Sequence, residues 1–304
     1  MIELPDIKEL HVEIDKIENK HTLEKNISLS ILRLDKIHPE IQGNKFFKLY
    51  YFLEKAITAQ NKIITFGGAY SNHLAATASA CRMFGIKCIG IVRGEEAKDI
   101  SHTLQFCKEH GMQLEFISRE DYKRKDDEDF RKELIPKFGD HILIPEGGYS
   151  KEGSDGAALI SNFYSKEGFT HICCAVGTAT TLTGLISSSL PSHHVIGFSA
   201  IKHLDDFEKR IQFLIGNSIN KNYSLTNDYD FGGYAKKTDE LISFMNAFYK
   251  AYAIPTDFVY TGKMMFGVLD LIKKNYFPAG SKILCIHTGG LQGNLSLQQG
   301  ILNF

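Results

Sequence analysis

Short apolar runs rich in β-branched residues alternate along the chain with longer segments of helical period. Such alternation is typical of βαβ units, which build parallel sheets. No internal repeat or low-complexity tract interrupts it. The pattern therefore predicts an α/β protein with open parallel sheets. Its predicted strands are residues 62–66, 87–92, 114–118, 141–144, 171–176, 195–199 and 282–287.

The clearest predicted helix lies between the first two of these strands, at residues 72–84. Leu74, Ala78 and Cys81 recur on one face of it. Ser71 is placed to cap its start, and Gly85 is placed to end it. The strand, capped helix and strand together form one predicted βαβ unit.

Two polar stretches are harder to interpret. Residues 119–133 carry a charge at every position except Tyr122 and Phe130, with the signs mixed. This predicts a solvated helix on the outside of the protein. Residues 205–240 are polar and contain glycines without a clean period. They could form a loop that covers a site or a plain surface excursion.

Length and composition restrict the possibilities. The 304 residues suit one large or two modest α/β domains, and 43% hydrophobic with 23% charged residues is ordinary for a soluble globular protein. A net charge of −1 gives no electrostatic reason to expect nucleic acid or an anionic membrane as a partner. No apolar run approaches the roughly 20 residues of a membrane span. The first residues lack the features of a signal peptide, so we expect a cytoplasmic protein.

The cysteines give no sign of a metal site. None forms a C-x-x-C pair, and no Cys/His cluster has the spacing of a zinc site. We expect no metal and interpret the cysteines as small buried side chains in a reducing compartment. They are Cys81, Cys88, Cys107, Cys173, Cys174 and Cys285.

Three glycine-bearing polar segments directly follow predicted strands, at residues 67–73, 177–184 and 288–290. Ligands of open parallel sheets bind beyond the carboxyl ends of the strands. We therefore expect all three segments to meet at one crevice. Their coincidence is more informative than any single loop, because glycines after strands are common in turns.

Each chemical candidate in these segments has an ordinary structural alternative. The 177–184 loop leads into a helix and is rich in hydroxyls, which suits phosphate, but it could be a threonine-rich turn. It has no lysine in the Walker position. Ser71 could lie near a reacting carbon or merely cap its helix. Lys45 has glycine and apolar neighbours, so burial could lower its pKa, although most lysines lie on the surface.

Ordered motifs carry a resemblance to a known family. They are Gly-Asn-Lys-Phe-Phe-Lys-Leu at 43–49, Thr-Phe-Gly-Gly-Ala-Tyr-Ser-Asn-His at 65–73, Pro-Glu-Gly-Gly at 145–148, the 177–184 loop, Val-Tyr-Thr-Gly-Lys at 259–263 and His-Thr-Gly-Gly at 287–290. From about residue 29 onward, the chain resembles D-cysteine desulfhydrases and 1-aminocyclopropane-1-carboxylate (ACC) deaminases. These are pyridoxal-5′-phosphate (PLP) enzymes of the tryptophan synthase β-like fold, PLP fold type II.

The resemblance implies roles at the matching positions. Lys45 would bind PLP covalently, Lys48 would help to neutralise the phosphate, and Asn72 would contact the phenolic oxygen. Thr288, with Thr261 nearby, would approach the ring nitrogen. Substrate would face Ser71, Tyr234 and Tyr260, with Lys45 completing the catalytic set. The phosphate would lie on the backbone of Gly177, Thr178, Ala179, Thr180 and Thr181.

Several positions depart from the family pattern. Ala179 and Thr180 stand where relatives have two glycines, which limits a loop that needs positive φ. Phe47 stands where relatives often have arginine, and Ala75 and Ala76 stand where arginine and glutamine are usual. Tyr234 is matched only through Gly-Gly-Tyr at 232–234. Thr261 occupies the place of a glutamate in ACC deaminases.

The resemblance implies two α/β domains with PLP in the cleft between them. The small domain would cover residues 48–150, and the large PLP-binding domain residues 1–47 plus 151–304. The expected activity is a PLP-dependent deaminase or lyase reaction, D-cysteine α,β-elimination to pyruvate, ammonia and sulfide, in a homodimer. The alternatives are ACC deamination, a β-replacement reaction that fits the motifs less well, and a PLP-binding homologue with little activity.

Overall fold

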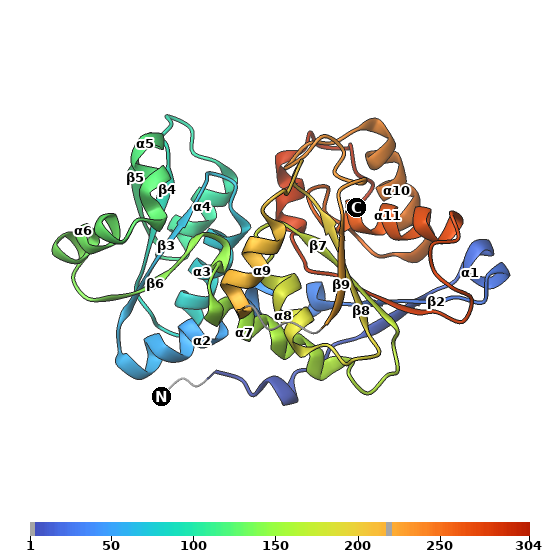
Figure 1. The fold of residues 1–304 in the computed structure, drawn as a ribbon. Coiled ribbons are helices and arrows are strands. Elements are labelled where there is room, and N and C mark those ends of the chain that lie inside the picture. The colour runs from blue at the N-terminus through green and yellow to red at the C-terminus, as the bar shows by residue number, and fades with distance from the viewer. Residues whose placement is uncertain (1–3, 217–220) are drawn as a thin grey trace.

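Two mainly parallel sheets organise the computed structural model, which describes residues 4–216 and 221–304 (Figure 1). The larger sheet has the order β1-β2-β10-β7-β8-β9, and the smaller has the order β5-β4-β3-β6. The larger sheet's strands are β1 (Ile14–Ile17), β2 (Ser28–Leu32), β7 (His171–Val176), β8 (His194–Ser199), β9 (Asn222–Thr226) and β10 (Lys282–Ile286). The smaller sheet's strands are β3 (Lys62–Gly67), β4 (Cys88–Arg93), β5 (Gln113–Ile117) and β6 (His141–Ile144).

All seven predicted strands are present, with ends that differ by at most one residue. They pair in parallel, as the alternating pattern predicted, and only β1 pairs antiparallel, with β2. The pattern missed β1, β2 and β9. Strands β1 and β9 lie at the two edges of the larger sheet. They carry polar residues and are only partly buried, which obscures the apolar signal.

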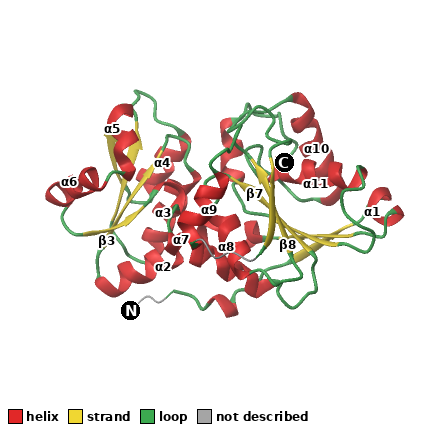
Figure 2. Ribbon diagram, in the orientation of Figure 1, coloured by secondary structure: helices red, strands yellow, loops and turns green. Residues whose placement is uncertain are grey.

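Helices flank both sheets (Figure 2). They are α1 (Lys20–Glu24), α2 (Asn44–Ala59), α3 (Asn72–Met83), α4 (His102–Glu109), α5 (Arg119–Lys123), α6 (Glu128–Phe138), α7 (Lys151–Ala158), α8 (Thr180–Ser188), α9 (Phe207–Ile215), α10 (Asp239–Tyr252) and α11 (Thr261–Lys273). In the described ranges, none of them has both the length and the apolar character needed to cross a bilayer.

Helix α3 forms as its sequence predicts. The Ser71 side chain accepts a hydrogen bond from the Leu74 amide at 3.2 Å, which satisfies one donor of the first turn. Gly85 follows the last turn with φ +67°, a conformation that glycine adopts at little cost. The Ser71 cap is therefore confirmed.

The prediction of one helix over residues 119–133 is wrong. Helix α5 ends at Lys123, a short 3-10 turn follows, and α6 begins only at Glu128. Asp127 has an extended backbone (ψ 129°), and its side chain accepts a hydrogen bond from the Asp129 amide. An aspartate in this geometry starts a new helix instead of continuing the old one. The two helices do lie on the outside, as expected.

The two sheets agree with the predicted division of the chain into two domains, but they do not determine the residues at which the domains begin and end. Every strand of the smaller sheet lies within residues 48–150, and every strand of the larger sheet lies outside that range. Helix α2, at residues 44–59, crosses the proposed limit at residue 48. The domain boundaries therefore stay a prediction.

Helices α2 and α7 pack closely where the two sheets meet. A Cβ added to Gly156 of α7 would lie 2.1 Å from the carbonyl oxygen of Phe47 in α2, so only glycine fits there. Phe47 is fully buried and forms an edge-to-face pair with Phe163, with the ring centroids 5.8 Å apart. All six cysteines are buried free thiols, as the sequence predicted.

We expect Gly156→Ala to lower the free energy of unfolding by about 1–3 kcal/mol, because the added methyl group would push α2 and α7 apart. Alanine otherwise favours a helix over glycine by up to ~1 kcal/mol, so helix propensity alone predicts the opposite sign. Urea denaturation measures the difference. Gly293→Ala is the control, since its Cβ would meet its nearest atom only at 3.7 Å. Unchanged stability in Gly156→Ala would contradict the packing argument.

Candidate functional site

A cavity of about 700 Å³ lies beyond the carboxyl ends of strands from both sheets. Residues from all three predicted segments line it: Ser71 follows β3, Thr178 follows β7 and Thr288 follows β10. Tyr234 also lines it, so part of the 205–240 stretch borders the site, although residues 217–220 lie outside the described residues. The predicted convergence of the three loops is confirmed.

Lys45 lies in the first turn of α2, and the residue before that helix determines its place. Gly43 has φ +65°, and a Cβ there would lie 1.9 Å from the carbonyl oxygen of Thr288. The next amide, that of Asn44, donates to the same carbonyl at 3.2 Å. The start of α2 is thus held directly against the loop after β10.

The two lysines of this helix have perturbed amines. Burial lowers the pKa of Lys45 to about 8, and the charge of Asp257 opposes the shift only in part. The Lys45 Nζ donates to the Asn44 Oδ1 at 2.8 Å. Burial, together with the nearby charge of Lys45, holds the pKa of Lys48 well below its usual value. Two amines this close favour an anionic ligand, which would relieve their repulsion.

The loop between β7 and α8 provides the opposite wall. The first turn of α8 has no side-chain cap, so its amides keep their capacity to bind an anion. The Lys48 Nζ lies 3.5 Å from the Thr178 Oγ1, which lies 2.9 Å from the Thr180 Oγ1. A Cβ at Gly177 would lie 3.1 Å from the Tyr260 ring, so glycine lets that ring pack on the loop.

Ala179 has a left-handed backbone conformation, which glycine adopts more easily than alanine. Its φ is +68°, in the left-handed region, and the side chain is buried. Alanine pays a penalty of roughly 1–2 kcal/mol in this region. Ala179 therefore takes up the left-handed conformation at a cost in stability.

Asn72 contains an unsatisfied polar atom. Its Oδ1 is buried and has no hydrogen-bond partner among the described residues. A buried acceptor without a donor costs about 1–3 kcal/mol, so a ligand donor at this position would repay the cost. Ser71 caps α3, but its hydroxyl hydrogen is still available for donation, since its oxygen is the acceptor in that cap.

Tyr234 and Tyr260 lie together in the cavity wall, with ring centroids 6.1 Å apart and an angle of 67° between the rings. Burial raises the pKa of Tyr260 well above its usual value, and the neighbouring Tyr234 adds to the shift. Loss of water around its hydroxyl also raises the pKa of Tyr234, although more than half of the side chain is exposed. Both hydroxyls are therefore protonated near neutral pH and can donate.

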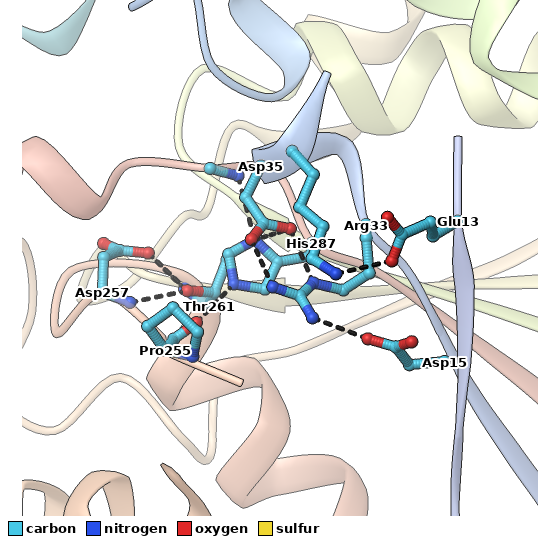
Figure 3. Close-up of polar contacts among 10 residues, drawn as sticks. Glu13, Asp15, Arg33, Asp35, Pro255, Asp257, Thr261 and His287 are labelled. Atoms are coloured by element: carbon cyan, nitrogen blue, oxygen red, sulfur yellow. Dashed lines mark hydrogen bonds and ion pairs between the residues drawn. The ribbon is translucent and has the colours of Figure 1, made fainter. Parts of the chain in front are cut away.

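Thr261 does not line the cavity, whereas Thr288 does. The Thr261 hydroxyl donates to the Asp257 Oδ1 at 2.6 Å and accepts from the Asp257 amide at 2.8 Å (Figure 3). Both residues are fully buried. The expected place for Thr261 near the ring nitrogen therefore has no support from this geometry, because its hydroxyl is already bonded within its own turn.

Sequence reasoning missed two residues that organise the site. The Asn44 Nδ2 donates to the Thr181 Oγ1 at 2.7 Å, so Asn44 joins the start of α2 to the first turn of α8. The Asp257 carboxylate accepts from the amides of Val259, Tyr260 and Thr261. Only Asp257 had a local signal, since an aspartate shortly before a helix often caps it.

The fold and this cavity define a PLP-dependent enzyme. A family model described as pyridoxal-phosphate dependent enzyme matches residues 21–289, and the chain belongs to that family. A Pyrococcus furiosus protein provisionally named 1-aminocyclopropane-1-carboxylate deaminase is 32% identical over 283 residues, 87% of this chain and 85% of the relative.

Two further similarities point the same way. The Arabidopsis thaliana mitochondrial protein named bifunctional D-cysteine desulfhydrase/1-aminocyclopropane-1-carboxylate deaminase is 29% identical and covers 87% of this chain and 73% of its own length. A crystal structure of an ACC deaminase homologue superposes with a TM-score of 0.78 at 28% identity, covering 95% of this chain and 92% of the other. The predicted fold type is thereby confirmed.

The residues present fit PLP. The cavity offers a buried amine that can bind an aldehyde, an uncapped helix start with a second lysine for a phosphate, and the unsatisfied Asn72 Oδ1 for a polar ring substituent. Lys45, Lys48 and the 177–181 backbone would hold the group. These assignments of individual residues are proposals.

We expect Ala179→Gly to raise the free energy of unfolding by about 0.5–1 kcal/mol. The relief of the left-handed penalty exceeds the extra entropy that glycine gives the unfolded chain. Ala158→Gly is the matched control, because Ala158 has a helical φ of −61° and the same change there should destabilise the protein. Urea denaturation of both variants checks the signs, and destabilisation by Ala179→Gly would refute the strain.

The rate at which added PLP forms a borohydride-reducible lysine adduct should depend on pH with a midpoint near 8. Only the neutral amine attacks an aldehyde, and the pKa of Lys45 is about 8. The rate should rise about tenfold per pH unit below that value and level off above it. Stopped-flow absorbance of the cofactor-free protein measures this. A rise that continued to about pH 10 would show an ordinary lysine.

Proposed function

We propose that this chain is a deaminase of a small amino acid that eliminates a β-substituent, with D-cysteine as the preferred type of substrate. The products would be pyruvate, ammonia and sulfide. The observation that supports the proposal best is the Lys45 amine of lowered pKa in one cavity with Ser71, Tyr234 and Tyr260. A homodimer is the expected assembly.

PLP, when bound, supplies the electron sink for negative charge that develops at the α-carbon of the substrate. The neutral Lys45 amine is the best candidate to take up the α-proton, because its lowered pKa leaves a useful fraction unprotonated at neutral pH. The start of α3 would bind the substrate carboxylate. Its backbone amides and the Ser71 hydroxyl are donors at the positive end of a helix dipole.

The tyrosines would assist departure of the β-substituent. A leaving thiolate needs a hydrogen-bond or proton donor, and the raised pKa values of Tyr260 and Tyr234 keep their hydroxyls protonated. Tyr234 is 56% exposed, whereas Tyr260 is deeply placed, so Tyr234 lies nearer the entrance. We therefore assign proton donation to this pair.

The charges in the cavity favour elimination over ring opening. Glu146 is the only acidic residue in its described lining, and its carboxylate accepts from the Tyr122 hydroxyl and pairs with Lys125. In the resemblance, the ring nitrogen faces Thr288, a neutral hydroxyl. A nitrogen without a carboxylate partner is less readily protonated and is a weaker sink. That sink suits a substrate with an α-proton and a good leaving group.

ACC deamination is the second candidate, because several relatives carry that name. A Thr261→Glu substitution would not separate the two activities, although glutamate occupies this place in ACC deaminases. The new carboxylate would lie against the buried Asp257 and would destabilise the protein. A PLP-binding homologue with little activity is the third candidate, but Ala179 still has the positive φ that a glycine at this position would adopt.

We expect Lys45→Ala to abolish both turnover and the reducible adduct, since alanine has no amine. Lys48→Ala should keep the adduct but weaken PLP binding by roughly 1.5–3 kcal/mol, the value of one charge-assisted contact. Mass spectrometry after borohydride reduction and PLP titration measure the two effects. Lys55→Ala is the control, because this lysine lies on the same helix but pairs with Glu152 at the surface. An adduct retained in Lys45→Ala would end the assignment.

An assay for keto acids across D-cysteine, D-serine, β-chloro-D-alanine, L-cysteine and ACC tests the choice of substrate. We expect the highest kcat/KM with D-cysteine and pyruvate as the product. Efficient formation of 2-oxobutyrate from ACC would favour the second candidate. A visible absorbance band of bound PLP that no amino acid changed would favour the homologue of little activity.

A further inference from the structure

His287 lies where three segments of the site meet. Strands β2 and β10 are neighbours in the larger sheet, and the His287 amide donates to the Leu32 carbonyl at 2.9 Å as the two strands end. His287 is the residue before Thr288 and is 1% exposed. Its ring points toward a buried ion pair on one side and toward the turn that carries Asp257 on the other (Figure 3).

The ion pair on the first side is Arg33 with Asp35. The Arg33 guanidinium donates to both carboxylate oxygens of Asp35, at 2.9 and 2.7 Å. Its third nitrogen, Nη1, donates to the Asp15 carboxylate at 2.6 Å. Burial raises the pKa of Asp35, but the hydrogen bonds from Arg33 and the charge of Arg33 outweigh it and lower the pKa overall. The carboxylate is therefore ionised and acts only as an acceptor.

The two ring nitrogens of His287 face different partners. Nε2 lies 2.7 Å from the Pro255 carbonyl oxygen, so it must carry a hydrogen. Nδ1 lies 3.3 Å from the Gly289 amide and 3.3 Å from the Asp35 Oδ1. A neutral ring accepts from Gly289 and a charged ring donates to Asp35, so Nδ1 has a partner in either state.

These contacts connect three segments that border the cavity: the start of α2, the loop after β10 and the turn before α11. Gly289 follows Thr288 directly, and Pro255 begins the turn that leads through Asp257 to Tyr260. The Leu34 carbonyl, inside the Arg33–Asp35 turn, accepts from the Gly43 amide at 2.9 Å, two residues before Lys45. One imidazole thus lies between the segments that carry the lysine, the threonine and the tyrosine.

We propose that His287 is a positioning residue that holds Thr288 and the 255–260 turn in register with the lysine helix. His287 does not line the cavity, so it would not contact a ligand bound there. The proposal rests on the proposed role of this cavity as the PLP site. The buried network of Arg33, Asp35 and His287 would then serve to position the residues of the cavity.

Two substitutions separate the two sides of the ring. In His287→Asn the amide can occupy the place of Nδ1 but cannot reach Pro255, whereas in His287→Gln the amide nitrogen can occupy the place of Nε2. Asn294 independently binds the Thr256 carbonyl and the Phe258 amide, at 3.0 and 3.2 Å, so the turn should still fold in both variants. His193→Asn is the matched control, because His193 is also 1% exposed, but its ring accepts from the Leu190 amide at 3.3 Å and contacts none of the segments that carry Lys45, Thr288 and Tyr260.

Hydrogen exchange of the cofactor-free variants gives a readout independent of activity. We expect faster exchange of the Gly289 amide in His287→Gln and faster exchange in the 255–261 turn in His287→Asn. With PLP bound, both variants should show a reduced visible circular dichroism band and a kcat lowered roughly 10- to 100-fold, with KM changed less. His193→Asn should lower the melting temperature without these effects.

Unchanged exchange, dichroism and kcat in both His287 variants would overturn the proposal and leave His287 a purely structural residue, even if their melting temperatures fell. Failure of the cavity as the PLP site has a different signature. In that case the wild-type protein would form no reducible adduct with PLP, while the exchange experiment on the cofactor-free chain would still decide the role of His287.

Discussion

Gly43 lies so close to the Thr288 carbonyl that no residue with a side chain could replace it. The arrangement of the cavity depends on this contact. The left-handed glycine turns the chain into α2, so Lys45 enters the cavity in the first turn of a rigid helix. The same contact joins α2 to the end of β10. Because a helix and a strand are both stiff, the backbone of Lys45 keeps a fixed position relative to the backbone of Thr288.

The cavity combines groups that are unfavourable without a ligand. Two buried amines repel each other, Asn72 has a buried acceptor with no partner, and α8 starts without a side-chain cap. Each feature costs free energy in the empty protein, and each is relieved by a ligand that carries an aldehyde, a phosphate and a polar ring substituent. Functional sites commonly show such local conflicts with stability, because binding repays them.

The sequence predicted those parts of the fold that have a strong local signal. Buried central strands such as β7 are continuous apolar runs, so their limits were predicted correctly, whereas the polar edge strands β1 and β9 of the larger sheet were missed, as was its interior strand β2. The helix predicted over residues 119–133 failed because charge alone does not reveal a new cap at Asp127. The three loops could be placed together because parallel strands end at one edge of a sheet.

Within the site, the sequence indicated which backbone segments border the cavity, but it could not indicate which partners their side chains bind. Thr261 follows Tyr260 in the sequence, but its hydroxyl bonds to Asp257 and does not face the cavity. Nothing in the local sequence shows that Asn44 binds Thr181, a residue 137 positions away. Such long-range side-chain bonds depend on the packing of α2 against α8, which a pattern of apolar positions cannot describe.

The lowered pKa of Lys45 also affects how the protein responds to electrophiles other than its cofactor. Near neutral pH, an amine of pKa about 8 is unprotonated a few hundred times more often than one at the ordinary value of 10.5. Metabolic aldehydes, cyanate or amine-directed reagents should therefore modify cofactor-free molecules at this lysine faster than at a lysine of ordinary pKa. Newly synthesised chains would need PLP early, since adduct formation at Lys45 by any other carbonyl compound blocks the cofactor permanently or delays its binding.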